Sequence, residues 1–269
     1  MPEEIRPIVA SIGDNCVDHY VAPVQRTHVG GNAANVAVGL ARSGLRTMYA
    51  GAVGDDADGR AVLDALAREG IDASAVVVRP GEPTGMCRVA LRADGERVFL
   101  DELVGASGRW LPSARDLESL NGCTWVHAAG LHADPGVLAR LAGPRISFDV
   151  SHHGRPLLPQ IAPHLEIAFF SGERGGRERA LALAQDAVAL GARAAVVTRG
   201  REGSLAFDGE LVEVAARPVE VVDTLGAGDA LIAATIAARI DGAELADALE
   251  AGARAAARAC GHYGAWEAA

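Results

Sequence analysis

The sequence predicts an α/β protein with a mainly parallel sheet, helices on both faces and a small β flap. Short apolar segments alternate with alanine-rich amphipathic segments almost from end to end, and such alternation is typical of a parallel sheet covered on both faces. Two hairpin signals, Asp94-Gly95 and Asp208-Gly209, interrupt the alternation. Neither a linker nor a repeat divides the 269 residues, so a single domain is expected over residues 1–269.

The first half of the chain holds two strand–helix pairs followed by an insert. Apolar runs at 8–12 and 47–53 are expected to be strands, each followed by a helix, at 32–42 and 57–69. Each helix ends at a glycine, the residue typical of helix C-termini: Gly44 and Gly70. The insert consists of short strands at 86–91 and 97–100, a hairpin rather than a crossover.

The second half resumes the alternation. Its expected strands are 125–129, 146–150, 167–170 and 194–198, with helices such as 177–190 between them. A second hairpin and two alanine-rich helices close the chain, at 204–207, 211–214, 227–240 and 246–260. Ligands of open parallel sheets bind beyond the carboxyl ends of the strands, so functional motifs are expected in the loops there.

Composition excludes several kinds of chemistry. All 25 residues counted as Lys or Arg are arginine. A P-loop, a protein-kinase site and a Schiff base each need a lysine, so none is present in its usual form. The net charge of −10 disfavours a nucleic-acid partner. No apolar run approaches the roughly 18 residues of a membrane span, and the acidic N-terminus is unlike a signal peptide. A cytoplasmic protein without a membrane partner is expected.

The four cysteines are far apart in the sequence and include no Cys-x-x-Cys pair. Their spacing therefore predicts neither a zinc site nor a disulfide framework. Four reduced thiols are expected: Cys16, Cys87, Cys123 and Cys260.

The strongest functional signal is the segment Asp223-Thr224-Leu225-Gly226-Ala227-Gly228-Asp229, which leads into a predicted helix. Two glycines before a helix let several backbone N–H groups point at one anion, aided by the partial positive charge of the helix N-terminus. A lone carboxylate at Asp229 would only complement that charge. An anion cradle beside a carboxylate, however, is typical of phosphoryl transfer, where the carboxylate accepts a hydroxyl proton.

A second signal is Gly30-Gly31-Asn32-Ala33-Ala34-Asn35, at the start of the first helix. Each asparagine amide both donates and accepts hydrogen bonds, as the hydroxyls of a polyol require. The alternative is that Asn32 caps the helix and Asn35 faces water. Asp14 and Asp18 follow the first strand and could bind sugar hydroxyls, although they could also be no more than a polar exit from the strand.

Together these segments resemble the paired signatures of the ribokinase-like (PfkB) carbohydrate kinases. Supporting segments occur in the family order, at Gly51-Ala52-Val53-Gly54-Asp55-Asp56 and Val197-Thr198-Arg199-Gly200. The resemblance covers essentially the whole chain. It implies a ribokinase-like three-layer sandwich with a mainly parallel central sheet and a small β flap, or lid, in segments about 20–29 and 86–100. Within the family, Ile12-Gly13-Asp14-Asn15-Cys16-Val17-Asp18 and Tyr263-Gly264-Ala265-Trp266 are similar to fructoselysine 6-kinases.

The resemblance implies ATP-dependent phosphorylation of a primary sugar hydroxyl, with the 6-hydroxyl of fructoselysine or a related fructosamine as the expected acceptor. Asp229 would be the base, with an anion hole at Gly226, Ala227 and Gly228. The sugar would be held by Asp14, Asp18, Gly31, Asn32 and Asn35. The nucleotide would be bound by Thr198, Gly200 and Gly203. ATP and Mg²⁺ are the expected cofactors, K⁺ is a further candidate at Asp223, and relatives often form homodimers through the lid.

The chain departs from the family pattern at three places. Leu231 and Ala234 stand where the family has Phe and Gly. Ser171-Gly172-Glu173-Arg174 replaces an Asn-x-x-Glu motif linked to Mg²⁺, which leaves Glu173, the candidate ligand, one residue out of step. The alternatives are another sugar or nucleoside kinase of the family, or a non-catalytic sugar-sensing protein on the same scaffold.

Overall fold

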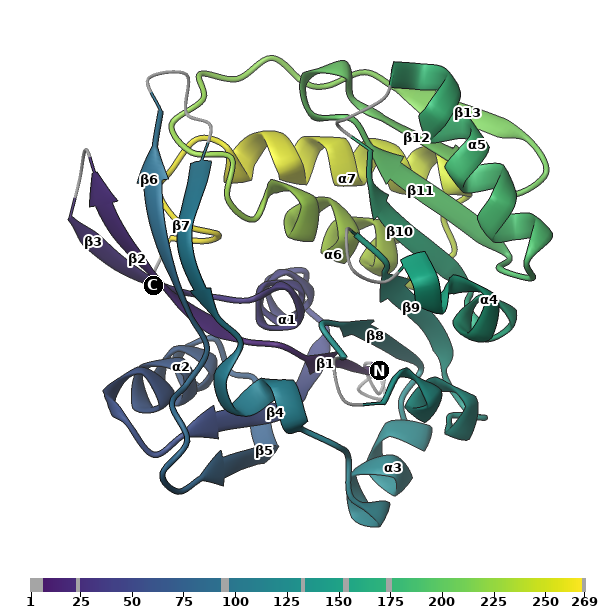
Figure 1. The fold of residues 1–269 in the computed structure, drawn as a ribbon. Coiled ribbons are helices and arrows are strands. Elements are labelled where there is room, and N and C mark those ends of the chain that lie inside the picture. Colours follow the sequence, from purple (N-terminus) through teal and green to yellow (C-terminus); the bar gives the residue numbers. More distant parts are fainter. Residues whose placement is uncertain are drawn as a thin grey trace, which may run out of the picture.

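A nine-stranded sheet forms the centre of the fold in the computed structural model, which describes residues 7–22, 25–92, 97–131, 134–151, 155–172 and 176–267. In chain order the strands are β1 (Ile8–Gly13), β4 (Arg46–Gly54), β5 (Asp72–Arg79), β8 (Trp125–Ala129), β9 (Arg145–Asp149), β10 (Ile167–Ser171), β11 (Ala194–Thr198), β12 (Ser204–Phe207) and β13 (Leu211–Val214). Their spatial order is β13-β12-β11-β10-β9-β8-β1-β4-β5 (Figure 1).

The sheet is parallel from β11 to β5, and β12 and β13 extend it as an antiparallel hairpin. The prediction of a mainly parallel α/β sheet is thus confirmed, and so is the second hairpin. A parallel sheet covered on both faces is buried on both, so its strands carry apolar side chains at successive rather than alternate positions. In β1, Val9 packs into one apolar cluster and Ala10 into another, on opposite faces.

Helices cover both faces of the sheet. One face carries α1 (Asn32–Arg42), α2 (Ala57–Arg68), α6 (Ala227–Ile240) and α7 (Leu245–Ala259). The other carries α3 (Ala114–Asn121), α4 (Leu158–Ile161) and α5 (Gly176–Ala189). Short 3₁₀ turns join several elements, at η1 (Gly105–Arg109), η2 (Pro135–Arg140), η3 (Arg155–Leu157), η4 (Ala162–His164) and η5 (Gly200–Glu202). The result is three layers, as expected.

The lid is a separate four-stranded sheet, in the order β3-β2-β6-β7, that stands to one side of the central sheet (Figure 1). Its strands are β2 (Cys16–Ala22), β3 (Arg26–Gly30), β6 (Met86–Leu91) and β7 (Arg97–Leu103). The predicted β6–β7 hairpin is confirmed as an antiparallel pair, while its turn at Asp94-Gly95 lies outside the described residues. β2 pairs in parallel with β6, so two segments far apart in sequence build the lid together.

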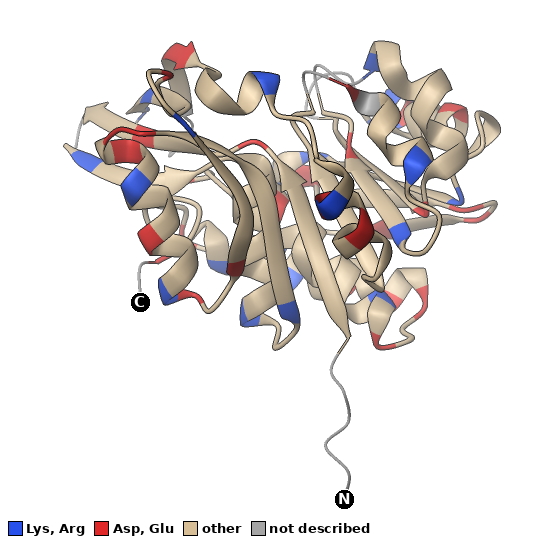
Figure 2. Ribbon diagram, turned by 90° about the horizontal axis from the view of Figure 1, so that it is seen from below, with Lys and Arg blue, Asp and Glu red and all other residues tan. Residues whose placement is uncertain are grey.

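The surface carries charges of both signs. Figure 2 shows arginines and acidic residues interspersed over helices and loops around the molecule. Among the described residues, no helix has the length and apolar character needed to cross a membrane.

Candidate active site

A cavity of about 990 Å³ lies beyond the carboxyl ends of the central strands, between the lid and the N-termini of α1 and α6. Asp14 follows β1, Asp149 ends β9, and Thr198 ends β11, and all three line the cavity. This is where ligands of open parallel sheets bind, because the loops that leave the strands diverge there.

Twelve of the predicted site residues line this cavity. They are Asp14, Asp18, Gly31, Asn32, Asn35, Thr198, Gly200, Gly203, Gly226, Ala227, Gly228 and Asp229. Asp223 does not line the cavity and is fully buried. Glu173 lies outside the described residues.

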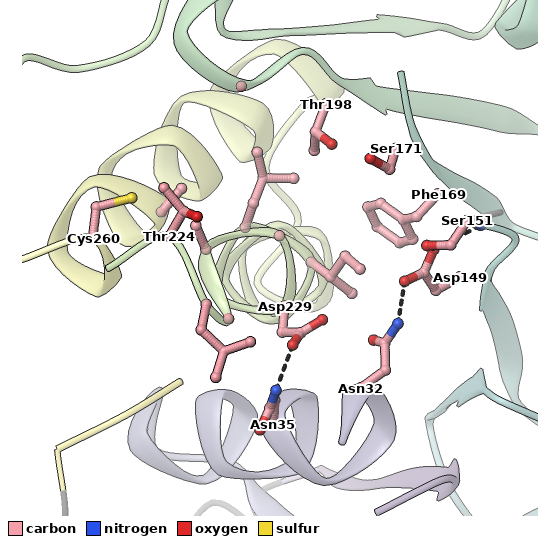
Figure 3. A pocket seen from close by; sticks show the side chains of 18 of the residues that line it. Asn32, Asn35, Asp149, Ser151, Phe169, Ser171, Thr198, Thr224, Asp229 and Cys260 are labelled. Atoms are coloured by element: carbon pink, nitrogen blue, oxygen red, sulfur yellow. Dashed lines mark hydrogen bonds between the residues drawn. The ribbon is translucent and has the colours of Figure 1, made fainter. Parts of the chain in front are cut away.

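Two asparagines of α1 each donate a hydrogen bond to a carboxylate across the cavity (Figure 3). Asn35 Nδ2 donates to Asp229 Oδ2 at 2.6 Å, and Asn32 Nδ2 donates to Asp149 Oδ2. The Oδ1 atoms of both asparagines are buried and have no hydrogen-bond partner among the described residues. A buried amide oxygen without a donor is costly, so a ligand rich in hydroxyl groups would satisfy both. The alternative that Asn35 merely faces water is wrong.

Asp14 supplies the cap of α1. Its carboxylate accepts the backbone N–H groups of Asn32 and Ala33 at 3.1 and 2.9 Å, a placement favoured by the partial positive charge of a helix N-terminus. The N-cap residue is Gly31, at φ +98°. The alternative that Asn32 caps the helix is therefore wrong, which leaves the Asn32 side chain to the cavity. A Cβ at Gly31 would lie 2.3 Å from Asn15 Cα, so only glycine fits here.

Asp149 is a cavity carboxylate that the sequence analysis missed. Ser151 donates to Asp149 Oδ1 from its backbone N–H at 3.0 Å, and its hydroxyl donates to the same atom. Burial raises the pKa of Asp149 above its ordinary value, although the hydrogen bonds from Ser151 and Asn32 act in the opposite direction. Ser151 has φ +31°, a strained conformation for a residue other than glycine. The position of Asp149 near the carboxyl end of the predicted strand 146–150 was the sequence feature that could have identified it as a site residue.

The turn that precedes α6 brings Asp229 into the cavity. Gly226 adopts φ +74°, and a Cβ there would lie 2.5 Å from Ala265 Cβ. The first N–H groups of a helix have no acceptor within the helix. The Ala227 N–H donates to the Thr224 carbonyl at 3.3 Å, whereas a Cβ at Gly228 would meet nothing within 4 Å. An anion can therefore approach the backbone closely at Gly228.

Asp223 anchors this turn from behind. Its Oδ1 accepts the N–H of Leu225 at 2.9 Å, and its Oδ2 accepts the N–H of Gly264 at 3.0 Å. The Tyr20 hydroxyl of β2 donates to the same Oδ2 at 2.5 Å. One buried carboxylate thus ties the turn before α6 to the C-terminal segment and to the lid.

The far end of the cavity has the composition of a nucleotide site. Apolar side chains form one wall there: Val219, Val221, Ala253, Ala256 and Ala257. Arg201 and Arg217 line the same cavity, and guanidinium groups suit phosphate oxygens. Neither arginine was predicted from the sequence. Thr198 lines this end too, and its hydroxyl donates to the Phe170 carbonyl at 3.3 Å.

The lid forms the opposite wall, with Cys16, Asp18, Cys87, Phe99 and Glu102. Of these only Asp18 was predicted. Pairing places Cys87 beside Asp18 on one side and Glu102 on the other. The pKa of Cys16 is raised, first by its hydrogen bond with Cys87 and then by burial. The raised pKa of Cys16 favours its protonated thiol, and none of the four cysteines forms a disulfide in this structure.

Comparison with known proteins agrees with this geometry. Residues 12–122 and 161–268 match the family described as "pfkB family carbohydrate kinase". The chain is 38% identical over 263 residues to a fructoselysine 6-kinase of Escherichia coli, covering 96% of this chain and 99% of that protein. It is 33% identical to a fructosamine kinase of Bacillus subtilis over 264 residues, 95% of this chain and 92% of that protein.

Among solved structures, the fold is similar to that of Arabidopsis thaliana ribokinase complexed with ribose and ATP. The TM-score is 0.83 at 23% identity, and the match covers 96% of this chain and 94% of that one. The expected ribokinase-like three-layer fold is confirmed.

Proposed function

Because the chain belongs to the pfkB family of carbohydrate kinases, and is thus an ATP-dependent sugar kinase, we propose that it phosphorylates the 6-hydroxyl of fructoselysine or a related fructosamine. The observation that carries the proposal is the position of Asp229. Its carboxylate faces the cavity from the first turn of α6, beside backbone that an anion can approach. Similarity to a fructoselysine 6-kinase and a fructosamine kinase supports the choice of substrate.

In this proposal Asp229 accepts the proton of the sugar hydroxyl as that oxygen attacks the γ-phosphorus of ATP. The turn Gly226-Ala227-Gly228 forms the anion hole, in which the Ala227 N–H would exchange the Thr224 carbonyl for the transferred group. Phosphoryl transfer depends mainly on positioning and on such electrostatic stabilisation. Asn35 holds the Asp229 carboxylate in place. The bond to the β-phosphate oxygen breaks as the new bond forms, leaving ADP and the sugar phosphate.

The sugar is assigned to the end of the cavity between α1 and the lid. The unpartnered Oδ1 atoms of Asn32 and Asn35 accept its hydroxyls. Asp18 binds it from the lid, while Asp14 and Gly31 act by fixing the start of α1. A fructosamine carries an amine that is cationic at neutral pH, and carboxylates of Asp18 and Glu102 line this end.

The nucleotide is assigned to the end lined by Thr198, Gly200 and Gly203, where apolar side chains suit a base and arginines suit phosphates. Mg²⁺ bound with the nucleotide would neutralise phosphate charge; Glu173, which lies outside the described residues, stays a candidate ligand. K⁺ at Asp223 also stays a prediction. The hydrogen bond from the Gly264 N–H to Asp223 supports the K⁺ site, because it places the backbone around Asp223 beside the backbone around Gly264.

We propose that residues 1–269 form one kinase domain with a lid, and that the lid closes over the sugar and excludes water. Tyr20 links the lid to the turn before α6, which supports such coupling. Hydrogen exchange with and without sugar tests closure: protection of β2 and β6 is expected with sugar, and unchanged exchange would contradict it. A cytoplasmic location is part of this proposal, and the use of ATP as co-substrate supports it.

A second copy of the chain is the proposed partner of the lid. Val98 and Leu100 of β7 are 40% and 48% exposed, and β7 is an edge strand whose backbone can pair with another strand. Light scattering of the purified protein is expected to give a dimer, and Leu100→Asp to give a monomer. A monomeric wild type would contradict the proposal.

A coupled ADP-release assay with fructoselysine, fructose, ribose and adenosine tests the substrate. The highest kcat/KM is expected for fructoselysine. Preference for fructose or ribose would leave a sugar kinase with another substrate, and preference for adenosine would indicate a nucleoside kinase. Sugar binding without ADP release would indicate a sensing protein.

A further inference from the structure

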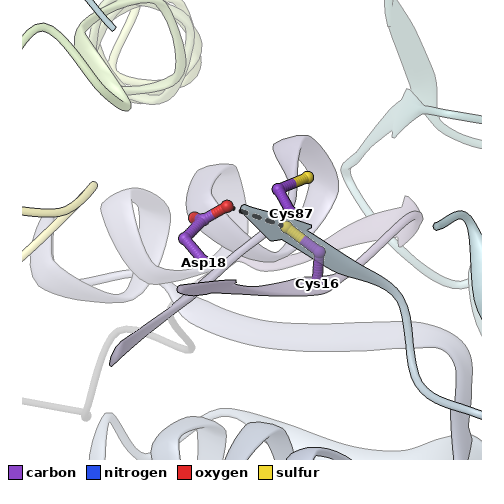
Figure 4. Close-up of side chains that lie close together, drawn as sticks. All are labelled: Cys16, Asp18 and Cys87. Atoms are coloured by element: carbon purple, nitrogen blue, oxygen red, sulfur yellow. Dashed lines mark hydrogen bonds between the residues drawn. The ribbon is translucent and has the colours of Figure 1, made fainter. Parts of the chain in front are cut away.

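Two cysteines and an aspartate meet on the face of the lid sheet that lines the cavity (Figure 4). Cys16 and Asp18 lie two residues apart on β2 and therefore share a face of the strand. Cys87 on β6 pairs with Asp18 across the parallel ladder. The fold thus brings together two thiols that are far apart in the sequence.

The three side chains present a compact set of ligand atoms. The Sγ atoms of both cysteines and a carboxylate oxygen of Asp18 all lie within 4.8 Å of one another. Cys16 Sγ donates to Asp18 Oδ1 at 3.5 Å. Asp18 and Cys87 are only 3% and 8% exposed, so the ligands are held by their surroundings.

The backbone opposite this cluster leaves room for it. A Cβ at Gly30 would lie 2.2 Å from Asp18 Oδ2 and 3.6 Å from Cys16 Sγ. Glycine at this position therefore lets the carboxylate lie against β3, beside the thiol of Cys16.

The donor set determines which cation fits. Two thiolates and a carboxylate are ligands of tetrahedral zinc, with Zn–S distances of about 2.3 Å and Zn–O distances of about 2.0–2.2 Å. Ligand atoms around such an ion are about 4 Å apart or less, so small side-chain rotations would complete the site. Soft thiolates favour zinc over Mg²⁺, which keeps this site distinct from the metal that accompanies ATP. A fourth position would face the cavity.

We propose that Cys16, Cys87 and Asp18 form a binding site for a soft divalent cation, Zn²⁺ in particular, and that the bound ion inhibits the kinase by competing with the sugar. The two thiols release their protons to solvent when the ion binds. The competition rests on the proposed function, which assigns Asp18 to the sugar. The binding site itself rests only on the geometry of the three side chains.

Direct metal binding tests the site without any reference to activity. Co²⁺ replaces Zn²⁺ as a coloured probe, and its titration into the reduced protein is followed by absorption. One equivalent is expected to bind, with the strong visible bands of tetrahedral Co²⁺ and a thiolate-to-metal band in the near ultraviolet; excess Zn²⁺ removes both. Absence of these bands in the wild type would overturn the proposal.

Cys87→Ser removes one ligand and is expected to abolish the thiolate band or to weaken Zn²⁺ binding by at least about 100-fold. This exceeds the loss of affinity that follows when only a hydrogen-bond partner of a metal ligand is removed. The matched control is Cys123→Ala. Cys123 is also a buried thiol, 5% exposed, but it does not line the cavity, so its loss is expected to leave binding unchanged. Equal binding by wild type and Cys87→Ser would place the metal elsewhere and overturn the assignment.

Kinetics then separate the site from the proposed function. Zn²⁺ inhibition is expected to be competitive with the sugar, non-competitive with ATP, and reduced at least about 10-fold in Cys87→Ser. Tetrahedral Co²⁺ at the cysteines without competition against the sugar would retain the binding site but contradict both the inhibitory role and the placing of the sugar beside Asp18.

Discussion

Asn35 Nδ2 donates to Asp229 Oδ2 at 2.6 Å, and the two residues are 194 positions apart in the sequence. Each lies in the first turn of its helix, so this hydrogen bond joins the N-termini of α1 and α6 across the cavity. In the proposed reaction the same contact fixes the catalytic carboxylate while the other amide atom of Asn35 accepts a sugar hydroxyl.

Asn35→Ala removes this contact. We expect kcat to fall about 10- to 100-fold, because a hydrogen bond to a charged group contributes about 1.5–3 kcal/mol, and the KM for sugar to rise because a hydroxyl partner is lost. Steady-state kinetics measure both. Asn35→Asp is expected to be worse, since it places a second negative charge beside Asp229. Unchanged kcat in both variants would contradict the positioning role.

Gly226→Ala is expected to lower kcat while leaving the protein folded. Its φ of +74° is strained for alanine by about 1–2 kcal/mol, and the new Cβ would collide with Ala265. The matched control is Gly242→Ala. Gly242 has a similar φ of +88°, but a Cβ there would meet nothing within 4 Å. Circular dichroism and kinetics compare the two. If both variants lowered kcat equally, backbone strain alone would explain the effect, and the close contact with Ala265 would have no role in catalysis.

Tyr20→Phe removes the hydroxyl that binds Asp223 at 2.5 Å. We expect a loss of stability of about 1.5–3 kcal/mol, because the acceptor is a buried carboxylate, and a lower melting temperature by several degrees. Thermal unfolding measures this. Hydrogen exchange is expected to rise in β2 and in the turn before α6 together; a rise in β2 alone would contradict the coupling between lid and turn.

His127 gives the fold a specific dependence on pH. Burial lowers its pKa to about 3, and its Nδ1 is 2.9 Å from Ser147 Oγ. The unfolded chain takes up this proton near pH 6.5, so stability falls as pH drops below about 6.5, by up to about 1.4 kcal/mol per unit. In His127→Gln this contribution is absent. Urea unfolding at pH 7.5 and 5 is expected to show a smaller decline in the free energy of unfolding than in the wild type. An equal decline in the two proteins would contradict the role of His127.

The regular βα alternation made most of the fold predictable. The range of α1 was predicted as 32–42, as observed, because its apolar face and its terminal glycine agree. β5 was missed; it is an edge strand in which none of the eight side chains is fully buried. α3 was missed although Ser113 and Asp116 form a capping box that marks its start. Its eight residues are too few for a clear helical period.

The candidate site was predictable where one segment contains the signal. The segment from Asp223 to Asp229 contains both the glycine turn and the carboxylate, so its chemistry could be predicted from the sequence. Asp149, in contrast, becomes a site residue only because Asn32 reaches it from α1. The pairing of β2 with β6 likewise places Cys16 beside Cys87. Such contacts depend on the tertiary fold, and no spacing within the sequence indicates them.

The central claim is that Asp229 is the base of an ATP-dependent sugar kinase, and Asp229→Asn tests it most directly. The variant keeps the size of the side chain and can still accept a hydrogen bond from Asn35, but it cannot take a proton. With fructoselysine and ATP, we expect kcat to fall by about 100-fold or more, with sugar binding measured by calorimetry retained. Turnover within tenfold of the wild type would contradict the account.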